Sequence, residues 1–220
     1  IRQIPGPCGH TVIQVDENGQ NCILLFGGSN RSMTKEFVDT VLDSFEEGDI
    51  ILLQNEINMV GEIIRLSHEK GCRVVFNASP IPGKPEELPL ELVDIFMVNE
   101  LEAAALAGTS TEGDFRDILK ALQKKYPKAA IVMTLGKEGV FYGYKEEFYS
   151  HPIFKVNAVD TTAAGDTFCG YFLAALCAEK SVETALREAS AASAMAVSAK
   201  GAAPSIPVHS AVEEWLCGRS

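Results

Sequence analysis

Between residues 34 and 134, short apolar segments alternate with longer amphipathic ones. The apolar segments have the length of strands, and they lie at 50–53, 73–76, 95–98 and 130–134. The amphipathic segments have the apolar period of helices, and they lie at 34–45, 59–70, 101–107 and 115–124. Apolar strands separated by helices build a parallel sheet that helices cover on both faces. We therefore expect an α/β fold of three layers with a Rossmann-like parallel sheet in the middle.

The pattern changes after residue 139. Segments 140–144 and 147–151 are expected to pair as a hairpin or as two strands, and segment 155–159 to be the end of another strand. Segments 165–178 and 181–199 are expected to be two helices, and their many small residues would let them pack closely. A strand, a tight loop and a helix would then follow one another around residue 160.

The loop at 159–168 has the sequence VDTTAAGDTF and opens directly into the first of these helices. Its small residues let the backbone approach an anion, and the first N–H groups of the helix have no partner within the helix. Asp166 is then well placed to accept a proton from a hydroxyl group that attacks a bound phosphate. The residues alone leave a second interpretation open, in which Asp160 caps a turn and Asp166 simply begins a helix.

Composition limits the classes of protein that this chain can be. A chain of 220 residues, 46% hydrophobic and 22% charged, can bury one substantial core. The net charge of −11 and the lack of a Lys/Arg cluster argue against nucleic-acid binding. No stretch reaches the ~18 apolar residues of a membrane span, and the first residues lack the features of a signal peptide. The six cysteines form no Cys-x-x-Cys pair, so we expect a cytoplasmic protein with reduced thiols.

Three short motifs resemble those of one enzyme family. Residues 160–166, DTTAAGD, resemble the signature of the ribokinase-like (PfkB) sugar kinases, which usually has glycine at the position of Ala163, although ribokinases tolerate alanine there. Residues 99–102, NELE, are similar to the family's Asn-x-x-Glu element, and residues 134–139, TLGKEG, to its nucleotide-binding strand and turn. The motifs follow the family's order and spacing, and the resemblance runs along essentially all 220 residues.

The resemblance implies a kinase site built largely from backbone groups. Asp166 would be the general base, and the N–H groups of Ala163, Ala164 and Gly165 would form the anion hole for the γ-phosphoryl group. Chemistry favours the same assignment, because phosphoryl transfer requires positioning and charge stabilisation. The implied nucleotide-binding residues are Asn99, Thr134, Gly136, Lys137, Glu138, Gly139, Gly165 and Ser190.

Two metal sites follow from the resemblance alone. Glu102 would hold Mg²⁺ near the phosphates, and K⁺ would lie beside the anion hole. The oxygens around K⁺, mostly backbone carbonyls, would come from Asp160, Thr162, Ala196, Ala199, Gly201 and Ser205. A plainer interpretation makes Asn99 and Glu102 a helix capping box, and lets Gly136 and Gly139 only shape a turn.

The first thirty residues differ in kind from the rest. Residues 11–26 are expected to form a β-hairpin around the Asn18-Gly19 step. In the resembled family such a hairpin belongs to a small lid over the sugar, and about a third of the polypeptide precedes it. We therefore expect residues 1–30 to be part of a β lid, residues 31–220 to be the nucleotide-binding and catalytic core, and the chain to be a C-terminal part of a longer protein. Exposed strand edges would also permit a homodimer through the lid.

The function that these expectations favour is that of an ATP-dependent carbohydrate kinase. It would transfer the γ-phosphoryl group of ATP to a primary hydroxyl of a sugar, with ribose as the favoured substrate. Glu56 follows the expected strand 50–53 and would contact the sugar, although it could equally be an exposed loop acid. The alternatives are a nucleoside, a fructose derivative or 2-keto-3-deoxygluconate as substrate, or a non-catalytic nucleotide-binding module.

Overall fold

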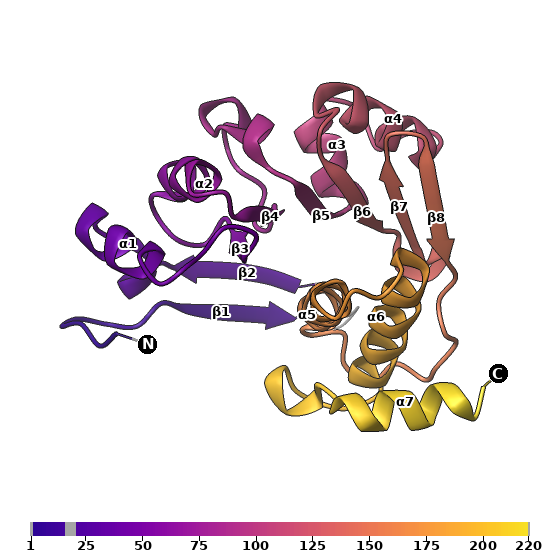
Figure 1. Ribbon diagram of the computed structural model, residues 1–220. Coiled ribbons are helices and arrows are strands. Elements are labelled where there is room, and N and C mark those ends of the chain that lie inside the picture. The colour runs from indigo at the N-terminus through magenta and orange to yellow at the C-terminus, as the bar shows by residue number, and fades with distance from the viewer. Residues whose placement is uncertain (1, 16–20, 220) are drawn as a thin grey trace. The chain divides into compact units, whose positions relative to one another are not determined.

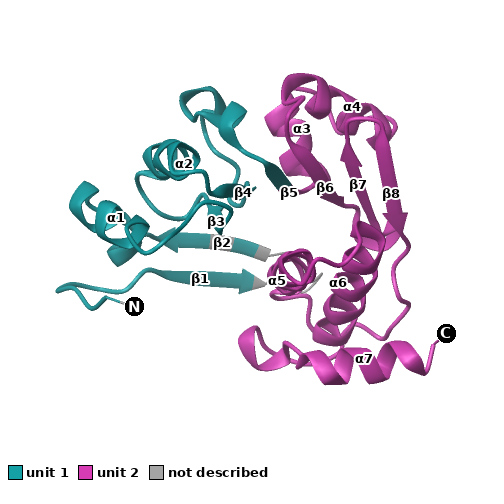
Figure 2. Cartoon of the chain, in the orientation of Figure 1, with its two compact units in different colours: residues 1–96 teal, residues 97–220 magenta. Residues whose placement is uncertain are grey.

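The computed structural model describes residues 2–15 and 21–219 and divides the chain into two compact units (Figure 2). Unit 1 is Ile1–Phe96 and unit 2 is Met97–Ser220. Within the described residues, no helix is both long enough and apolar enough to cross a membrane. The boundary that the sequence led us to expect at residue 30 stays a prediction, since compactness alone divides the chain elsewhere.

The described residues of unit 1 form two pairs of strands and two α-helices (Figure 1). They are β1 (His10–Val15), β2 (Asn21–Phe26), β3 (Ile50–Gln54), β4 (Arg73–Asn77), α1 (Lys35–Leu42) and α2 (Val60–Glu69). The strands β1 and β2 pair antiparallel in a sheet of their own, as predicted, and the Asn18-Gly19 turn between them lies outside the described residues. The strands β3 and β4 pair parallel, and α2 packs against both.

Unit 2 contains the remaining strands and helices, and β5 begins just before its boundary. They are β5 (Ile95–Asn99), β6 (Ala130–Thr134), β7 (Val140–Tyr144), β8 (Glu147–His151), α3 (Glu100–Ala107), α4 (Phe115–Lys125), α5 (Ala164–Cys177), α6 (Val182–Val197) and α7 (His209–Cys217). The sequence predicted each of these except α7, with boundaries that differ by a few residues. Strands β3 to β8 follow one another in order in one sheet. The sheet is mixed because β3 and β4 pair parallel, whereas β7 pairs antiparallel with both β6 and β8.

Two neighbouring residues of β7 show that helices cover both faces of the sheet in unit 2. The Phe141 ring contacts Phe115 of α4, with ring centroids 4.5 Å apart, and the Tyr142 ring contacts Phe172 of α5 at 6.5 Å. Successive side chains of a strand point to opposite faces, so α4 and α5 lie on opposite sides of β7. With α6 packed against α5, this is the predicted three-layer α/β arrangement.

One predicted element is wrong. Residues 155–159 were expected to be the end of a strand, but residues 152–158 belong to no helix or strand. The sequence FKVNAV alternates as a strand does, yet the β7–β8 ladder ends at the pair Val140–His151, and a strand needs a partner for its backbone groups. The chain reaches α5 through an irregular segment instead.

Candidate active site

The tight loop before α5 leaves the first turn of that helix open to a ligand. Ala163 is the N-cap residue with φ of +59°, and within the described part of the chain no side chain caps this helix end. The Ala164 N–H donates a long 3.3 Å hydrogen bond to the Thr161 carbonyl. Uncapped N–H groups at the positive end of a 14-residue helix are suited to bind an anion. A left-handed φ also explains why glycine suits this position in the resembled family.

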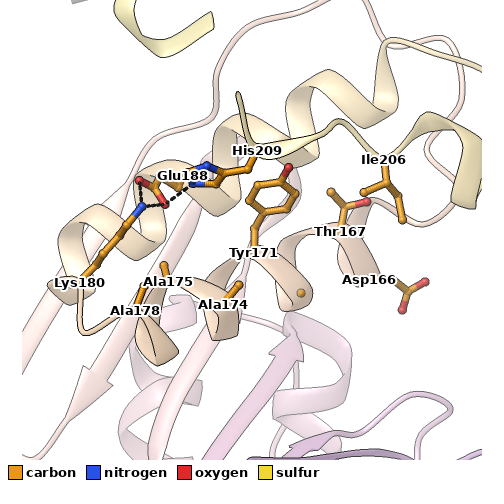
Figure 3. Close-up of a pocket in the computed structure, with 11 residues that line it drawn as sticks. Asp166, Thr167, Tyr171, Ala174, Ala175, Ala178, Lys180, Glu188, Ile206 and His209 are labelled. Atoms are coloured by element: carbon orange, nitrogen blue, oxygen red, sulfur yellow. Dashed lines mark hydrogen bonds and ion pairs between the residues drawn. The ribbon is translucent and has the colours of Figure 1, made fainter. Parts of the chain in front are cut away.

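Asp166 lies in the first turn of α5, and its side chain is exposed. It lines a cavity of about 590 Å³ whose floor is the face of α5 that carries Gly170 and Ala174 (Figure 3). The far end of this cavity is polar, because Lys180 forms an ion pair with Glu188 at 2.7 Å. An acid that takes a proton from a substrate must be reachable, and Asp166 meets this requirement.

Asp160 fastens the loop to the end of α6. Its Oδ1 accepts the Thr162 N–H at 3.0 Å, and its Oδ2 accepts the Gly201 N–H at 3.0 Å. Hydrogen bonds from the Thr162 side chain, the Gly201 N–H and the Thr162 N–H lower the pKa of Asp160 to about 2. Asp160 is therefore ionised at neutral pH and joins two segments that are 41 residues apart.

Two further hydrogen bonds tie the loop to α6. The Val197 carbonyl accepts the Val159 N–H at 2.7 Å, and the Ser193 hydroxyl donates to the Ala164 carbonyl at 3.0 Å. Ser193 was not among the predicted site residues. A sequence signal existed, since Ser193 lies one turn after Ser190 on the helix predicted to pack closely. The position of the anion loop thus depends on α6 as well as on α5.

A second cavity, of about 620 Å³, adjoins this loop within unit 2. It brings together seven of the residues predicted for the nucleotide and anion sites, which are Thr134, Gly136, Lys137, Gly139, Ala164, Gly165 and Ser190. The four other residues predicted for these sites are not among its lining residues, which are Asn99, Glu138, Ala163 and Asp166. A nucleotide whose phosphates met the N-terminus of α5 would have room for its base and ribose here.

The turn between β6 and β7 forms one edge of this cavity. Residues Gly136–Glu138 form a 3₁₀ turn, in which the Glu138 N–H donates a 3.0 Å hydrogen bond to the Leu135 carbonyl, and the Leu135 N–H donates a 2.8 Å hydrogen bond to the Gly139 carbonyl across the turn. Gly139 has φ of +99°, and a Cβ atom there would clash with the His151 carbonyl oxygen. Gly139 therefore has the shaping role of the plainer interpretation, and the turn also lines the cavity.

Sequence reasoning missed the apolar wall of the same cavity. This wall comes from segment 152–158 and from the facing helices, and its apolar members are Ile153, Phe154, Val156, Ala158, Phe168, Ala194 and Val197. Residues 155–159 were expected to be the end of a strand, and this expectation concealed the role of segment 152–158. Apolar side chains of this kind would suit the base of a nucleotide.

Asn99 and Glu102 form a complete capping box at the start of α3. The Asn99 Oδ1 accepts the Glu102 N–H at 2.9 Å, and the Glu102 Oε2 accepts the Asn99 N–H at 2.9 Å. The plainer interpretation of this motif is thus confirmed as a structural fact. The capping role does not prevent a second role, because a carboxylate offers the hard oxygen that Mg²⁺ prefers. Nucleotide binding by Asn99 and Mg²⁺ binding by Glu102 therefore stay predictions.

The residues predicted to surround K⁺ lie on two segments that the structure joins. Asp160 and Thr162 are in the loop, and the others lie between the last turn of α6 and the 3₁₀ turn Ala203–Ser205. The Asp160–Gly201 hydrogen bond brings the segments together. Among the described residues, no three His, Cys, Asp or Glu side chains gather as a metal site. A cation there would rely on backbone oxygens, as the resemblance implies.

Glu56, the predicted sugar contact, lies in the turn after β3 in unit 1 and is exposed. Its position at the carboxyl end of a parallel strand agrees with the prediction, and its contact with substrate stays a prediction.

Comparison with known proteins agrees with this site. Residues 3–209 match the model of the pfkB family of carbohydrate kinases. The chain is 36% identical over 212 residues to ribokinase from Haemophilus influenzae. The aligned region covers 94% of this chain and 69% of that protein. It is also similar to the crystal structure of ribokinase from Thermotoga maritima, with a TM-score of 0.82 and 35% identity over 97% of this chain and 71% of that one.

A further solved structure shows the ligands of a relative. Ribokinase from Arabidopsis thaliana, complexed with ribose and ATP, has a TM-score of 0.80 and 32% identity over 96% of this chain and 70% of that one. The family match, these identities and the three-layer fold agree with the three motifs at 99–102, 134–139 and 160–166. The chain therefore belongs to the pfkB family of carbohydrate kinases and is an ATP-dependent sugar kinase.

Proposed function

We propose that the chain transfers the γ-phosphoryl group of ATP to a primary hydroxyl group of ribose. The observation that carries this proposal is the first turn of α5, where Asp166 stands next to a helix end that no described side chain caps. The similarity to ribokinases, one of them complexed with ribose and ATP, supports the choice of sugar.

The proposed reaction needs few groups. The sugar hydroxyl gives its proton to the Asp166 carboxylate while its oxygen forms a bond to the γ-phosphorus, and the bond from that phosphorus to the bridging oxygen of ADP breaks. The N–H groups of Ala163, Ala164 and Gly165 would stabilise the charge on the transferred group. The long 3.3 Å bond of the Ala164 N–H is weak enough to yield to such a partner.

Two cations complete the proposal. Mg²⁺, held near Glu102, would neutralise charge on the phosphate oxygens when it is bound. K⁺ would bind backbone oxygens of the loop that contains Asp160 and Thr162 and of the segment after α6. The support for the second site is the joined geometry of these two segments.

We also propose that β1 and β2 pair with a second copy of the chain. Val12, Ile13, Leu24 and Leu25 are between 51% and 59% exposed on this two-stranded sheet, and apolar strands with open edges favour pairing. Sedimentation across micromolar concentrations should show a dimer. A profile with monomer alone would remove this proposal.

The decisive experiment compares two acids in the same kind of position. ATP turnover is measured over ribose, deoxyribose, fructose derivatives, 2-keto-3-deoxygluconate and nucleosides with Mg²⁺ and K⁺, on this chain and on the product of its complete reading frame. Asp166→Asn should lower kcat by about 10² to 10⁴ with little change in ADP affinity. Asp117→Asn, which removes an exposed first-turn acid of α4, should leave kcat unchanged. Near-normal turnover by Asp166→Asn, or a preference for another substrate class, would contradict the proposal.

A further inference from the structure

The apolar wall of the 620 Å³ cavity is held by side-chain packing. Ile153, Phe154 and Val156 line the cavity, but they belong to segment 152–158, which is in no helix or strand. A segment without a hydrogen-bonded ladder takes its position from the side chains that it packs against. The residues behind this wall therefore decide where it stands.

Phe154 is packed between two rings. Its ring centroid is 5.0 Å from that of His151, at an interplanar angle of 40°, and 5.0 Å from that of Trp215, at 78°. The second geometry is edge-to-face, the arrangement in which aromatic pairs attract one another most specifically. Behind Trp215, the Arg219 guanidinium carbon lies 4.0 Å from the centre of the indole ring. Trp215 is thus a fixed support and not a freely rotating surface side chain.

The helix that carries Trp215 is itself anchored. Helix α7 packs against α6 (Figure 1), and Val212 and Leu216 of α7 form a buried cluster with Ala191 and Ala192 of α6. Phe154 and Trp215 pack against this cluster. Helix α6 also supplies Ser190 to the cavity, so one helix pair supports two of its sides.

We propose that Trp215 is a positioning residue of the nucleotide site, which holds Phe154 in the wall that receives the base. Trp215 is not among the residues that line the cavity, so it acts through Phe154. The phosphates are fixed at the N-terminus of α5, which leaves the apolar wall to set base affinity. This inference rests on the proposed function, because it requires a nucleotide in this cavity.

The test uses the tryptophan itself, since Trp215 is the only one in the chain. ADP added to the wild-type chain should change the intrinsic tryptophan emission. Trp215→Leu should weaken ADP binding and raise the KM for ATP, each by about 3- to 10-fold, with kcat and the KM for sugar nearly unchanged. Trp215→Phe keeps a ring edge against Phe154 and should restore both constants to within about 2-fold of wild type.

A matched variant separates positioning from general loosening of α7. Tyr171 donates a 2.6 Å hydrogen bond to the Pro207 carbonyl just before α7, and Tyr171→Phe removes it. Both Tyr171→Phe and Trp215→Leu should lower the melting temperature, but only Trp215→Leu should weaken ADP binding. Equal effects of the two variants on ADP binding, or no effect of Trp215→Leu, would overturn the inference.

The outcomes distinguish this inference from the proposed function. If the chain phosphorylates ribose and Trp215→Leu leaves ADP binding unchanged, the inference fails and the function stands. If no sugar is phosphorylated but calorimetry shows the predicted loss of ADP affinity in Trp215→Leu, the function fails and the inference stands. If wild-type chain does not bind ADP, both are overturned.

Discussion

Replacing Gly139 by alanine should damage both the stability of the chain and its nucleotide site. The backbone at Gly139 has φ of +99° and ψ of −140°, a region that is nearly closed to other residues, and forcing alanine into it costs about 1 to 3 kcal/mol. The added Cβ would also clash with the His151 carbonyl oxygen and lie 2.9 Å from the Pro152 Cα. These are backbone atoms, so the two segments must separate by about 1 Å, as in an overpacked core.

The combined loss of unfolding free energy in Gly139→Ala is about 3 to 5 kcal/mol. Movement of His151 and Pro152 also displaces Phe154, so the KM for ATP should rise in whatever protein remains folded. Gly136→Ala is the control within the same turn, because φ there is +51° and nothing lies within 4 Å of the added Cβ. It should cost only about 1 kcal/mol.

Urea unfolding of the three proteins, followed by far-ultraviolet circular dichroism, measures both differences on one scale. The reasoning is refuted if Gly139→Ala loses less than about 1 kcal/mol, or if it loses no more than Gly136→Ala. An unchanged KM for ATP in a strongly destabilised Gly139→Ala would refute only the link from this turn to the cavity wall.

Two further predictions concern pH. The pKa of Asp160 is about 2 in the folded chain, below its ordinary 3.8, so its ionised form adds stability above about pH 4, and this stability is lost as the pH falls toward 2. The melting temperature of Asp160→Asn should therefore change less with pH across this range than that of the wild type. Parallel curves of melting temperature against pH for the two proteins would contradict this. The pKa of His151 is lowered from 6.5, chiefly by burial, so the neutral ring is favoured in the folded chain and stability is lost as the pH falls below about 6.5. The melting temperature of His151→Gln should therefore fall less than that of the wild type between about pH 7 and 5. An equal fall of the melting temperature in both proteins would refute this.

The order of strands and helices could be predicted from the sequence because local apolar period determines it. The segments around β3, β4, β5 and β6 are continuous apolar runs, and each becomes a strand. Residues 155–159 alternate as a strand does but belong to no strand, because strand formation also depends on a neighbour with free backbone groups. Helix α7 was also missed; it is nine residues long, and Val212 and Leu216 are its buried residues.

The two ends of the 620 Å³ cavity also differ in whether local sequence or long-range packing determines the positions of their residues. At the phosphate end, position depends on backbone geometry and a few local hydrogen bonds, such as those of Asp160, and short motifs encode these directly. At the base end, position depends on packing between residues far apart in sequence, such as Phe154 and Trp215, which no local pattern records. Sequence reasoning therefore predicted groups for phosphoryl transfer and missed the packed residues that we propose to receive the base.

This difference also divides the expected effects of substitution. Groups at the phosphate end act on charge that develops during transfer, so their loss should lower kcat, as predicted for Asp166. Groups at the base end would contact the nucleotide equally before and during transfer. Their loss, or the loss of Trp215 that positions Phe154, should therefore raise the KM for ATP and leave kcat nearly unchanged. Because Ser193 and Ser190 both belong to α6, a substitution that shifts this helix should change kcat and KM together.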